Sequence, residues 1–404
     1  MSSPLADRVI EEAISHGLAF LKVAQPNDLG ITGGHQSGFH LSKQVAHVFT
    51  PQEPTKGVNH DHPVRIRWEN GDTTDSVVKW YGRGTRSEYR LTSFNRIRSF
   101  YYLQAERLGS VLVLIQVDQD DWLGYMLETD DDIEAVLAAL GLDLADATWA
   151  LYAGSEPGPR DRPDPTECER REVEEFLARH CDFPKTTTVS AAAREAHRHC
   201  RPDVTGTDAS LLSWLRIEFD LFQALERKLV LGQVQGGFST VDEFVREANS
   251  VLQRRKARAG HSLENHVAAT LLDAEVAFEA QPSLDGTKPD FVMPSKAAYD
   301  ALGPDGGSEE VFVVAVKTTC KDRWRQVIQE GPRVDRKYLL TLQRGISSSQ
   351  MKEMHDAGVQ LVVPSALHAD YAPVDRSRLM TVEAFVSLLP KGDADANLEA
   401  SSLF

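Results

Sequence analysis

The chain has 404 residues, of which 41% are hydrophobic and 26% charged, and this composition predicts a soluble globular protein with two or three domains. Its net charge of −16 argues against nonspecific adhesion to nucleic acid, but it does not exclude a specific DNA-binding protein, because local fields decide binding. No apolar run is long enough to cross a membrane, and the N-terminus lacks the basic start and apolar stretch of a signal peptide.

Residues 40 to 153 have the composition of strands and turns with some helix. The segments VRIRW (64–68), SVVKWYG (76–82) and SVLVLIQV (110–117) indicate strands, and ENGDT (69–73) is typical of a turn. Residues 131–141 predict a short helix with acidic residues in its first turn and Gly141 at its end. Upstream, GITGGHQSG (30–38) lacks the Gly-Lys-Ser/Thr of a phosphate-binding loop, which favours a tight turn over a nucleotide site.

A linker is predicted at residues 154–167, where GSEPGPRDRPDPTE combines prolines, glycines and charges. After it the pattern becomes helical over 167–180 and 208–230, where apolar residues recur every three to four positions. A further helix is predicted to begin with Thr240 as its cap and to end near Gly260, and another to begin with Ser262 as its cap.

The four cysteines, Cys168, Cys181, Cys200 and Cys320, are few and scattered. Together with the absence of a signal peptide they predict a reducing, cytoplasmic location without structural disulfides. Histidines precede or adjoin Cys181 and Cys200, but their spacing fits no common zinc site, so a polar helix surface is the favoured interpretation.

Strand patterns dominate the C-terminal part, in DFVM (290–293), VFVVAVK (311–317), KYLLTL (337–342) and VQLVVP (359–364). A helical segment, SSSQMKEMHDAG (347–358), separates the last two. This order predicts an α/β domain with a central mixed sheet.

Charged residues stand at the ends of these predicted strands. Lys317 ends a fully apolar run, Asp290 opens the preceding strand, Glu264 lies on a helix upstream and Glu330 follows downstream. Carboxylate oxygens suit Mg²⁺, which polarises a phosphodiester and activates water, and a neighbouring lysine can orient that water or stabilise charge on the phosphate. The pattern predicts a PD-(D/E)XK nuclease, with Ala315 at the place of the usual second acid and Glu330 as its replacement.

Several motifs closely resemble the EcoRII family of type II restriction endonucleases. They are GITGGHQSG, RRKARAGHSLENH, KPDFVMPS, AVKTTCKDRWRQ and GVQLVVPS. The resemblance supports the catalytic set Glu264, Asp290, Lys317 and Glu330, with Asp290 and Glu330 as the metal ligands, because this family also displaces the second acid downstream. It further implicates Tyr299 in catalysis.

The same resemblance implies DNA-reading residues behind the catalytic lysine. Lys321, Asp322 and Arg323 match the family's base-reading element, in which Arg offers a fork to guanine and Asp accepts from the cytosine amino group. A basic run at 254–258 is interpreted as a phosphate-contacting patch, with solvated surface as the alternative. Its members are Arg254, Arg255, Lys256 and Arg258.

The N-terminal part resembles the family's effector domain, a mainly β DNA-binding pseudobarrel with helices. In the family this domain binds a second DNA site and blocks the catalytic cleft when empty. The predicted DNA-binding positions are His35, His40, Arg86, Glu88 and Arg90, with His40 standing where the family has tyrosine.

The predicted organisation is an effector domain at 1–153, a linker and connecting helix at 154–184, and an endonuclease domain at 185–404. The predicted function is a cytoplasmic, homodimeric, Mg²⁺-dependent type II restriction endonuclease, which cleaves double-stranded DNA at a short C/G-flanked, CCWGG-like site. The alternative is a DNA-binding regulator with a degenerate nuclease fold, motivated by Ala315.

Overall fold

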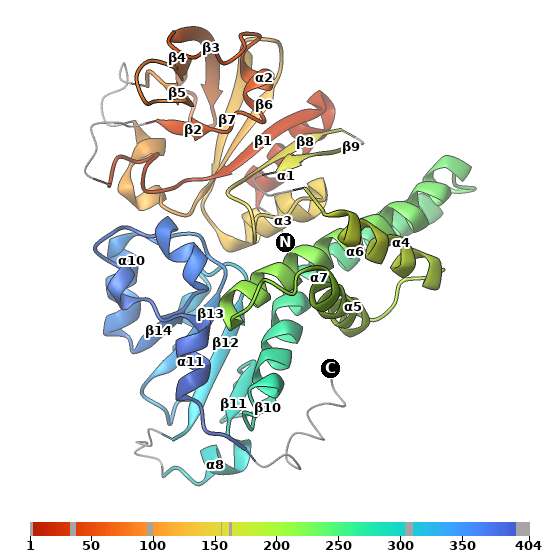
Figure 1. The fold of residues 1–404 in the computed structure, drawn as a ribbon, viewed down its shortest axis with the longest axis vertical. Coiled ribbons are helices and arrows are strands. Elements are labelled where there is room, and N and C mark those ends of the chain that lie inside the picture. Colours follow the sequence, from red (N-terminus) through yellow and green to blue (C-terminus); the bar gives the residue numbers. More distant parts are fainter. Residues whose placement is uncertain are drawn as a thin grey trace. The chain divides into compact units, whose positions relative to one another are not determined.

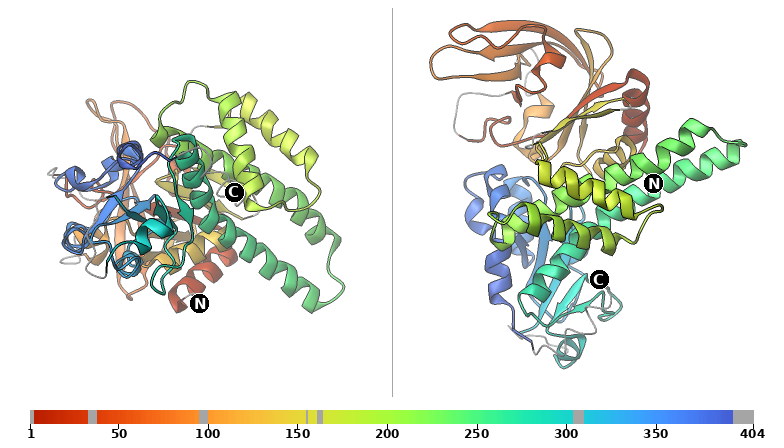
Figure 2. Two further views of the ribbon diagram at one scale, coloured as in Figure 1. Left: turned by 90° about the horizontal axis from the view of Figure 1, so that it is seen from below. Right: turned by 45° about the vertical axis from the view of Figure 1, so that its right-hand side comes forward.

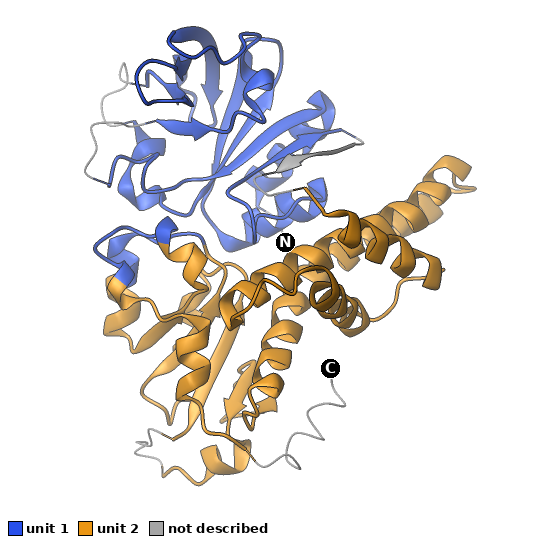
Figure 3. Ribbon diagram, in the orientation of Figure 1, with its two compact units in different colours: residues 1–162, 344–351, 369–376 blue, residues 163–343, 352–368, 377–404 orange. Residues whose placement is uncertain are grey.

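The structure is a computed structural model that describes residues 3–32, 38–94, 100–154, 156–160, 164–303 and 310–392. The chain divides into two compact units (Figure 3). Unit 1 comprises residues 1–162, 344–351 and 369–376, and unit 2 comprises residues 163–343, 352–368 and 377–404. The predicted fold class is confirmed: a mainly β unit with helices precedes an α/β unit with a mixed sheet. No helix within the described ranges is long and apolar enough to span a membrane.

Unit 1 is built on a nine-stranded sheet of order β2-β5-β4-β3-β7-β6-β1-β8-β9. Neighbouring strands are antiparallel except β3 and β7, which are parallel. The strands are β1 (Leu18–Val23), β2 (Phe39–Leu41), β3 (His60–Trp68), β4 (Thr73–Tyr81), β5 (Glu88–Thr92), β6 (Val111–Gln116), β7 (Asp121–Leu127), β8 (Trp149–Ala153) and β9 (Glu156–Arg160). The helices are α1 (Pro4–His16), α2 (Ala46–Phe49), α3 (Asp130–Leu140) and the short 3₁₀ turns η1 (Tyr101–Leu103) and η2 (Ala105–Arg107).

Two cores fill unit 1 because its long strands carry apolar side chains on both faces. Helices α1 and α3 cover an aliphatic core against β1 and β6, and an aromatic core that includes Trp68 and Trp122 fills the other side. The predicted helix end at Gly141 is confirmed, since this glycine adopts the left-handed conformation and closes α3.

The predicted linker contains regular structure. Strand β9 lies inside residues 154–167 and pairs with β8, which extends the sheet of unit 1 beyond residue 153. Two C-terminal segments also belong to unit 1: Arg344 pairs with Asp370 at 2.7 Å, and its Nε donates to the carbonyl of Leu144 at 3.3 Å. Distant backbone segments therefore complete unit 1.

Unit 2 holds a five-stranded sheet of order β10-β11-β12-β13-β14, in which β10 to β12 are antiparallel and β12 to β14 parallel (Figure 1). The strands are β10 (Glu279–Ala280), β11 (Phe291–Met293), β12 (Phe312–Lys317), β13 (Lys337–Thr341) and β14 (Val359–Val362). The helices are α4 (Glu167–Arg179), α5 (Thr186–Cys200), α6 (Thr207–Gly236), α7 (Val241–Asp273), α8 (Lys296–Asp300), α9 (Trp324–Val327) and α11 (Val382–Leu388). Helix α10 (Ser348–Asp356) and the 3₁₀ turns η3 (Ser365–Asp370) and η4 (Arg376–Arg378) each contain residues of both units.

Helix α7 corrects the prediction of two helices. Thr240 caps it as predicted, accepting from the amide of Glu243, but the helix runs unbroken through Gly260 to Asp273. Ser262 is buried inside it rather than capping a new helix. Glycine in a helix costs only about 1 kcal/mol, and burial of apolar residues such as Leu263 and Val267 outweighs that cost.

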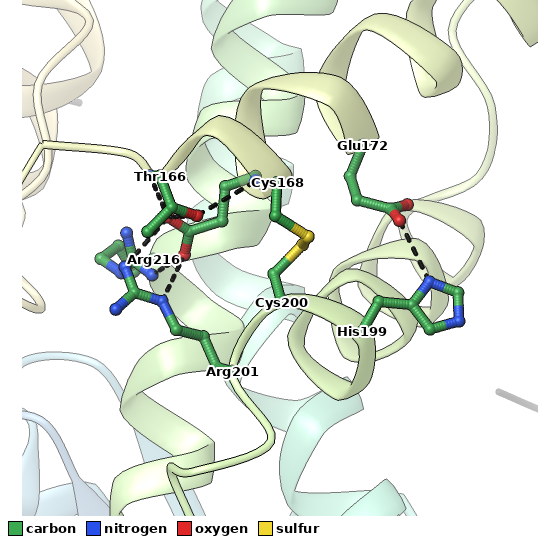
Figure 4. The surroundings of a disulfide bond; sticks show 8 residues. Thr166, Cys168, Glu172, His199, Cys200, Arg201 and Arg216 are labelled. Carbon is green, nitrogen blue, oxygen red and sulfur yellow. Dashed lines mark hydrogen bonds and ion pairs between the residues drawn. A yellow bond between two sulfur atoms is a disulfide. The ribbon is translucent and has the colours of Figure 1, made fainter.

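The prediction that disulfides are absent is wrong. Cys168 of α4 and Cys200 of α5 form a disulfide with a Cα–Cα distance of 5.5 Å (Figure 4). The cysteines are 32 residues apart, and α4 and α5 pack against each other and against α6, so only the tertiary fold brings them together. Beside the disulfide, the buried carboxylate of Glu169 binds Arg201 at 2.9 Å and also contacts Arg216.

Candidate active site

Lys317 and Asp290 meet at the end of the central strand of unit 2. The Nζ of Lys317, the last residue of β12, lies 2.8 Å from Oδ2 of Asp290, which precedes β11. The same oxygen accepts from the backbone amide of Val316 at 2.6 Å. Antiparallel pairing of β11 with β12 places both residues at one end of the sheet, which confirms the juxtaposition expected from the two strand patterns.

Glu330 lies on the loop that follows α9, and this loop passes close to strand β12. The following residue, Gly331, has a φ of +55°, and a Cβ there would lie 2.7 Å from Cγ2 of Val313. Only glycine permits that conformation and that approach without displacement. Burial raises the pKa of Glu330 to about 7; the positive charge of Lys317 partly opposes this rise, and the negative charge of Asp290 adds to it. No hydrogen bond from the described residues reaches the buried Oε2 of Glu330.

Glu264 joins the same electrostatic neighbourhood from helix α7. Burial raises the pKa of its carboxyl first, and the negative charge of Asp290 raises it further, while His261 and Lys317 oppose the shift. His261 lies on the same helix face, its Nδ1 3.7 Å from Oε2 of Glu264, and Gln281 donates to that oxygen at 3.4 Å. Lys317 and Asp290 are therefore in contact, and the charges of both act on Glu264 and Glu330. We name these four residues, which were predicted as the catalytic set, the carboxylate–lysine cluster.

The structure adds His261 and Gln281, which the sequence analysis did not single out. The spacing of His261, three residues before Glu264 on a helix, was a usable signal. No sequence signal pointed to Gln281, because its position is set by a long-range contact: its own backbone amide donates to the carbonyl of Asp290 at 2.8 Å.

Tyr299 lies in the core that supports the Glu330 loop. Its hydroxyl donates to Asp285 at 2.8 Å and accepts from the backbone amide of Arg333 at 3.2 Å, and the guanidinium of Arg333 pairs with Asp285 at 2.8 Å. The side chain of Tyr299 is fully buried. Through these contacts Tyr299, Asp285 and Arg333 tie the loop after Glu330 to the core, and the catalytic role of Tyr299 stays a prediction.

The cluster is a suitable environment for one hard cation. Its acids repel each other, and one buried carboxylate oxygen lacks a hydrogen bond, so a bound cation would relieve both penalties. In the part of the chain that the structure describes, no three His, Cys, Asp or Glu side chains lie close enough together to ligate a metal. The carboxylates of Asp290 and Glu330 are oxygen donors, the ligand type that hard divalent cations take.

The predicted base-reading residues follow β12 with unequal exposure. Lys321 is buried, Asp322 is exposed and Arg323 is intermediate. Burial of Lys321 is at odds with a long side chain reaching for a base, whereas Asp322 and Arg323 remain accessible. Nearby, Arg325 pairs with Glu353 at 2.9 Å and covers the ring of Trp324.

Most of the basic run at 254–258 serves the helical packing of unit 2. Arg254 binds Glu247 at 2.8 Å and lies over the ring of Phe183, and Arg255 binds Glu226 at 2.6 Å. The buried guanidinium of Arg258 stacks near Phe219 and Phe222. Lys256 is exposed. The described contacts of these three arginines thus lie within unit 2, and the phosphate-contacting role of the run stays a prediction.

In unit 1 the predicted DNA-binding residues also separate by burial. Arg90 is 2% exposed and donates to the carbonyl of Gly38 at 3.3 Å, so it supports the fold rather than facing a base. Arg86 is exposed above the ring of Tyr81, and Glu88 begins β5. The backbone amide of His40 donates to the carboxylate of Asp28 at 2.7 Å, and burial lowers the pKa of the His40 imidazole. His35 lies outside the described residues.

Comparison with known proteins finds two family models along the chain. Residues 13–138 match the model "Restriction endonuclease EcoRII, N-terminal", and residues 222–386 match "EcoRII C terminal". The chain is 32% identical over 399 residues to the type II restriction enzyme EcoRII of Escherichia coli, covering 94% of this chain and 96% of that protein. It is 24% identical over 147 residues to the type II restriction enzyme SsoII of Shigella sonnei, covering 34% and 46%.

Two solved structures are similar at lower levels. Metal-depleted Ecl18kI in complex with uncleaved, modified DNA aligns with a TM-score of 0.42 and 16% identity, covering 59% of this chain and 91% of that chain. A complex of restriction endonuclease PspGI with substrate DNA aligns with a TM-score of 0.41 and 13% identity, covering 56% and 96%.

Proposed function

Because this chain belongs to the EcoRII family of type II restriction endonucleases, we propose that it is an Mg²⁺-dependent, site-specific deoxyribonuclease. Its substrate would be double-stranded DNA carrying a short C/G-flanked, CCWGG-like site. The observation that carries the proposal is the carboxylate–lysine cluster, in which Lys317 and Asp290 form an ion pair and the charges of both act on Glu264 and Glu330, the four residues coming from four separate segments of unit 2.

Asp290 and Glu330 would hold the metal in this proposal. When bound, Mg²⁺ would polarise the phosphodiester and lower the pKa of a coordinated water. Ionised Glu330 is required for that role, and a cation would favour the ionised form, since burial without one raises the pKa of this carboxyl to about 7.

Lys317 would act on the phosphate or on the attacking water. Its ammonium is fixed by Asp290 at 2.8 Å and sits on a strand rather than on a loop, so its position is well defined. A fixed cation stabilises the charge that develops on phosphate oxygens without a cost of reorganisation. The adjoining segment would read the DNA through Asp322 and Arg323, which couples recognition to the catalytic centre.

Unit 1 is proposed to bind a further DNA site as an effector domain and to restrain the nuclease until that site is filled. Of the residues predicted for this role, the exposed Arg86 and the strand residue Glu88 are the best candidates, because Arg90 is internal. The proposal also includes a homodimer and a cytoplasmic location.

Lys317→Ala tests the nuclease proposal. Supercoiled plasmid carrying a CCWGG site is incubated with Mg²⁺, and binding is measured in Ca²⁺ or EDTA by gel shift. We expect wild-type protein to cut and Lys317→Ala to lose at least about 10²-fold in rate with DNA binding retained. Lys352→Ala, which removes an exposed lysine of α10, is the matched control. Undiminished cutting by Lys317→Ala would refute the assignment.

One observation favours a second candidate, a DNA-binding regulator with an inactive nuclease fold. Ala315 stands where the motif carries an acid, and its side chain is fully buried. The same plasmid experiment separates the two functions, since binding without cleavage under Mg²⁺, Mn²⁺ or Co²⁺ would support the regulator.

A further inference from the structure

The segment that follows Lys317 lies beyond the last paired position of its strand. Strand β12 pairs with β13 in parallel as far as Lys317, which lies opposite Thr341, and residues 318–323 then lead to α9 outside any helix or strand. We name residues 318–323 the recognition segment, because Asp322 and Arg323 within it are the residues proposed to read DNA. Since the strand ladder ends before this segment, other groups must bind its backbone.

Two side chains from the end of β13 and the residues after it replace the ladder. The side-chain amide oxygen of Gln343 accepts from the backbone amide of Cys320 at 3.2 Å, and the hydroxyl of Thr341 donates to the carbonyl of Thr318 at 3.4 Å. The two anchors are also connected, because the backbone amide of Gln343 donates to the Thr341 hydroxyl at 3.1 Å. Thr341 and Cys320 are fully buried and Gln343 is 3% exposed, so water cannot readily replace these partners.

A third hydrogen bond ties the recognition segment to helix α7. The hydroxyl of Thr318 donates to the carbonyl of Ala259 at 3.2 Å. Figures 1 and 2 show the C-terminal part of α7 beside the strands of unit 2, and this helix contacts β12. The recognition segment is thus held between the end of β13 and the helix that carries Glu264.

We propose that Gln343 is a positioning residue for DNA recognition, because its amide oxygen determines where the recognition segment presents Asp322. This inference rests on the proposed function, in which Asp322 reads a C·G pair. A hydrogen bond to a base edge weakens steeply with displacement and misalignment, whereas phosphate contacts carry no sequence information. Loss of the Gln343 anchor therefore lowers discrimination between DNA sites.

The experiment measures discrimination by the full-length protein in Mg²⁺. Discrimination is the ratio of kcat/KM for a duplex carrying CCWGG to kcat/KM for a duplex whose outer C·G pairs are replaced by A·T pairs. The proteins are wild type, Asp322→Ala, Gln343→Met and the double variant. Methionine has nearly the length of glutamine but lacks the amide oxygen. Gln343→Glu keeps an oxygen acceptor at the same place and serves as the conservative rescue.

We expect Asp322→Ala to lower the ratio by about 10–100-fold and Gln343→Met by about 5–10-fold. The double variant should discriminate no worse than Asp322→Ala, because both changes remove the same contact with DNA. Gln343→Glu should stay within about threefold of wild type, since a carboxyl oxygen can accept from the Cys320 amide. A role in folding alone would instead give a double variant whose loss is the product of the two single losses.

The second anchor provides an independent test if Gln343→Met does not fold. Thr341→Val removes the hydroxyl at nearly constant volume and should lower the ratio by about 3–10-fold. Thr270→Val is the matched control, because the Thr270 hydroxyl is also buried but donates to the carbonyl of His266 within its own helix. This control should leave the ratio unchanged. Circular dichroism checks that each variant keeps wild-type helicity.

Multiplicative losses in the double variant, or an unchanged ratio in Asp322→Ala or Gln343→Met, would overturn the proposal. If wild type cuts neither duplex, the nuclease proposal fails, and dissociation constants measured in Ca²⁺ then replace kcat/KM in the same comparison. A saturating effect of the double variant in binding would support the positioning role without cleavage. Wild-type protein that discriminates between the duplexes in neither assay would overturn both proposals.

Discussion

Gly331 allows the strictest test of how Glu330 reaches the site. In Gly331→Ala, the new Cβ would lie 2.7 Å from Cγ2 of Val313, so the loop must move by about 0.7 Å to reach ordinary contact at 3.4 Å. The φ of +55° adds strain of about 1–2 kcal/mol, and overpacking adds about 1–3 kcal/mol. We take the total as about 3 kcal/mol, which lowers the melting temperature of unit 2 by about 6–12 °C.

The displacement should also reach catalysis, because Glu330 is the adjacent residue. A shift approaching 1 Å in a catalytic group costs up to about 10²-fold in rate, so single-turnover plasmid cleavage should fall by about 10–100-fold. Differential scanning calorimetry and quenched-flow cleavage measure the two effects.

Two further variants separate the causes. Gly286 also has a positive φ, of +86°, but no atom lies within 4 Å of an added Cβ, so Gly286→Ala should cost only the strain of about 1–2 kcal/mol. Val313→Ala removes the clashing methyl groups, and Gly331→Ala in that background should cost about 1–3 kcal/mol less than in wild type. Strictly additive effects of Val313→Ala and Gly331→Ala would refute the contact argument.

Three other predictions concern unit 2. Burial would raise the pKa of Glu169, but hydrogen bonds from Arg201, Arg216 and the Thr166 amide outweigh it and hold this pKa at about 2. The carboxylate therefore contributes stability that is complete above pH 4.5 and is lost as the pH falls towards 2. Glu169→Gln should flatten the acid limb of a plot of melting temperature against pH, and an unchanged limb would contradict this. Arg333→Ala should weaken Mg²⁺ binding by about 10–100-fold in isothermal titration calorimetry by loosening the Glu330 loop, while Arg378→Ala, elsewhere in the unit, should not. Cys168→Ser should lower stability by up to about 3–4 kcal/mol, the chain-entropy value for a 32-residue separation, and reductant should abolish the difference from wild type.

Local pattern determined much of this protein. Apolar runs located strands β11 to β14, Thr240 and Gly141 marked helix ends, and charged residues at strand ends located the site. These features depend on neighbours along the chain: caps satisfy free backbone groups of a helix, and adjacent strand ends share one edge of a sheet. For that reason Asp290 and Lys317 were expected together, and they lie 2.8 Å apart.

Only the tertiary structure decided which charged residues face solvent. Arg90 and Arg258 look like DNA-binding arginines in sequence. In the structure, the guanidinium of Arg90 donates to the backbone carbonyl of Gly38, and the guanidinium of Arg258 lies near the rings of Phe219 and Phe222. Cys168 and Cys200 became partners because two helices pack side by side, and α7 passes through Gly260 because its apolar face is buried. Burial and long-range pairing depend on what packs against a residue, and no window of sequence contains that information.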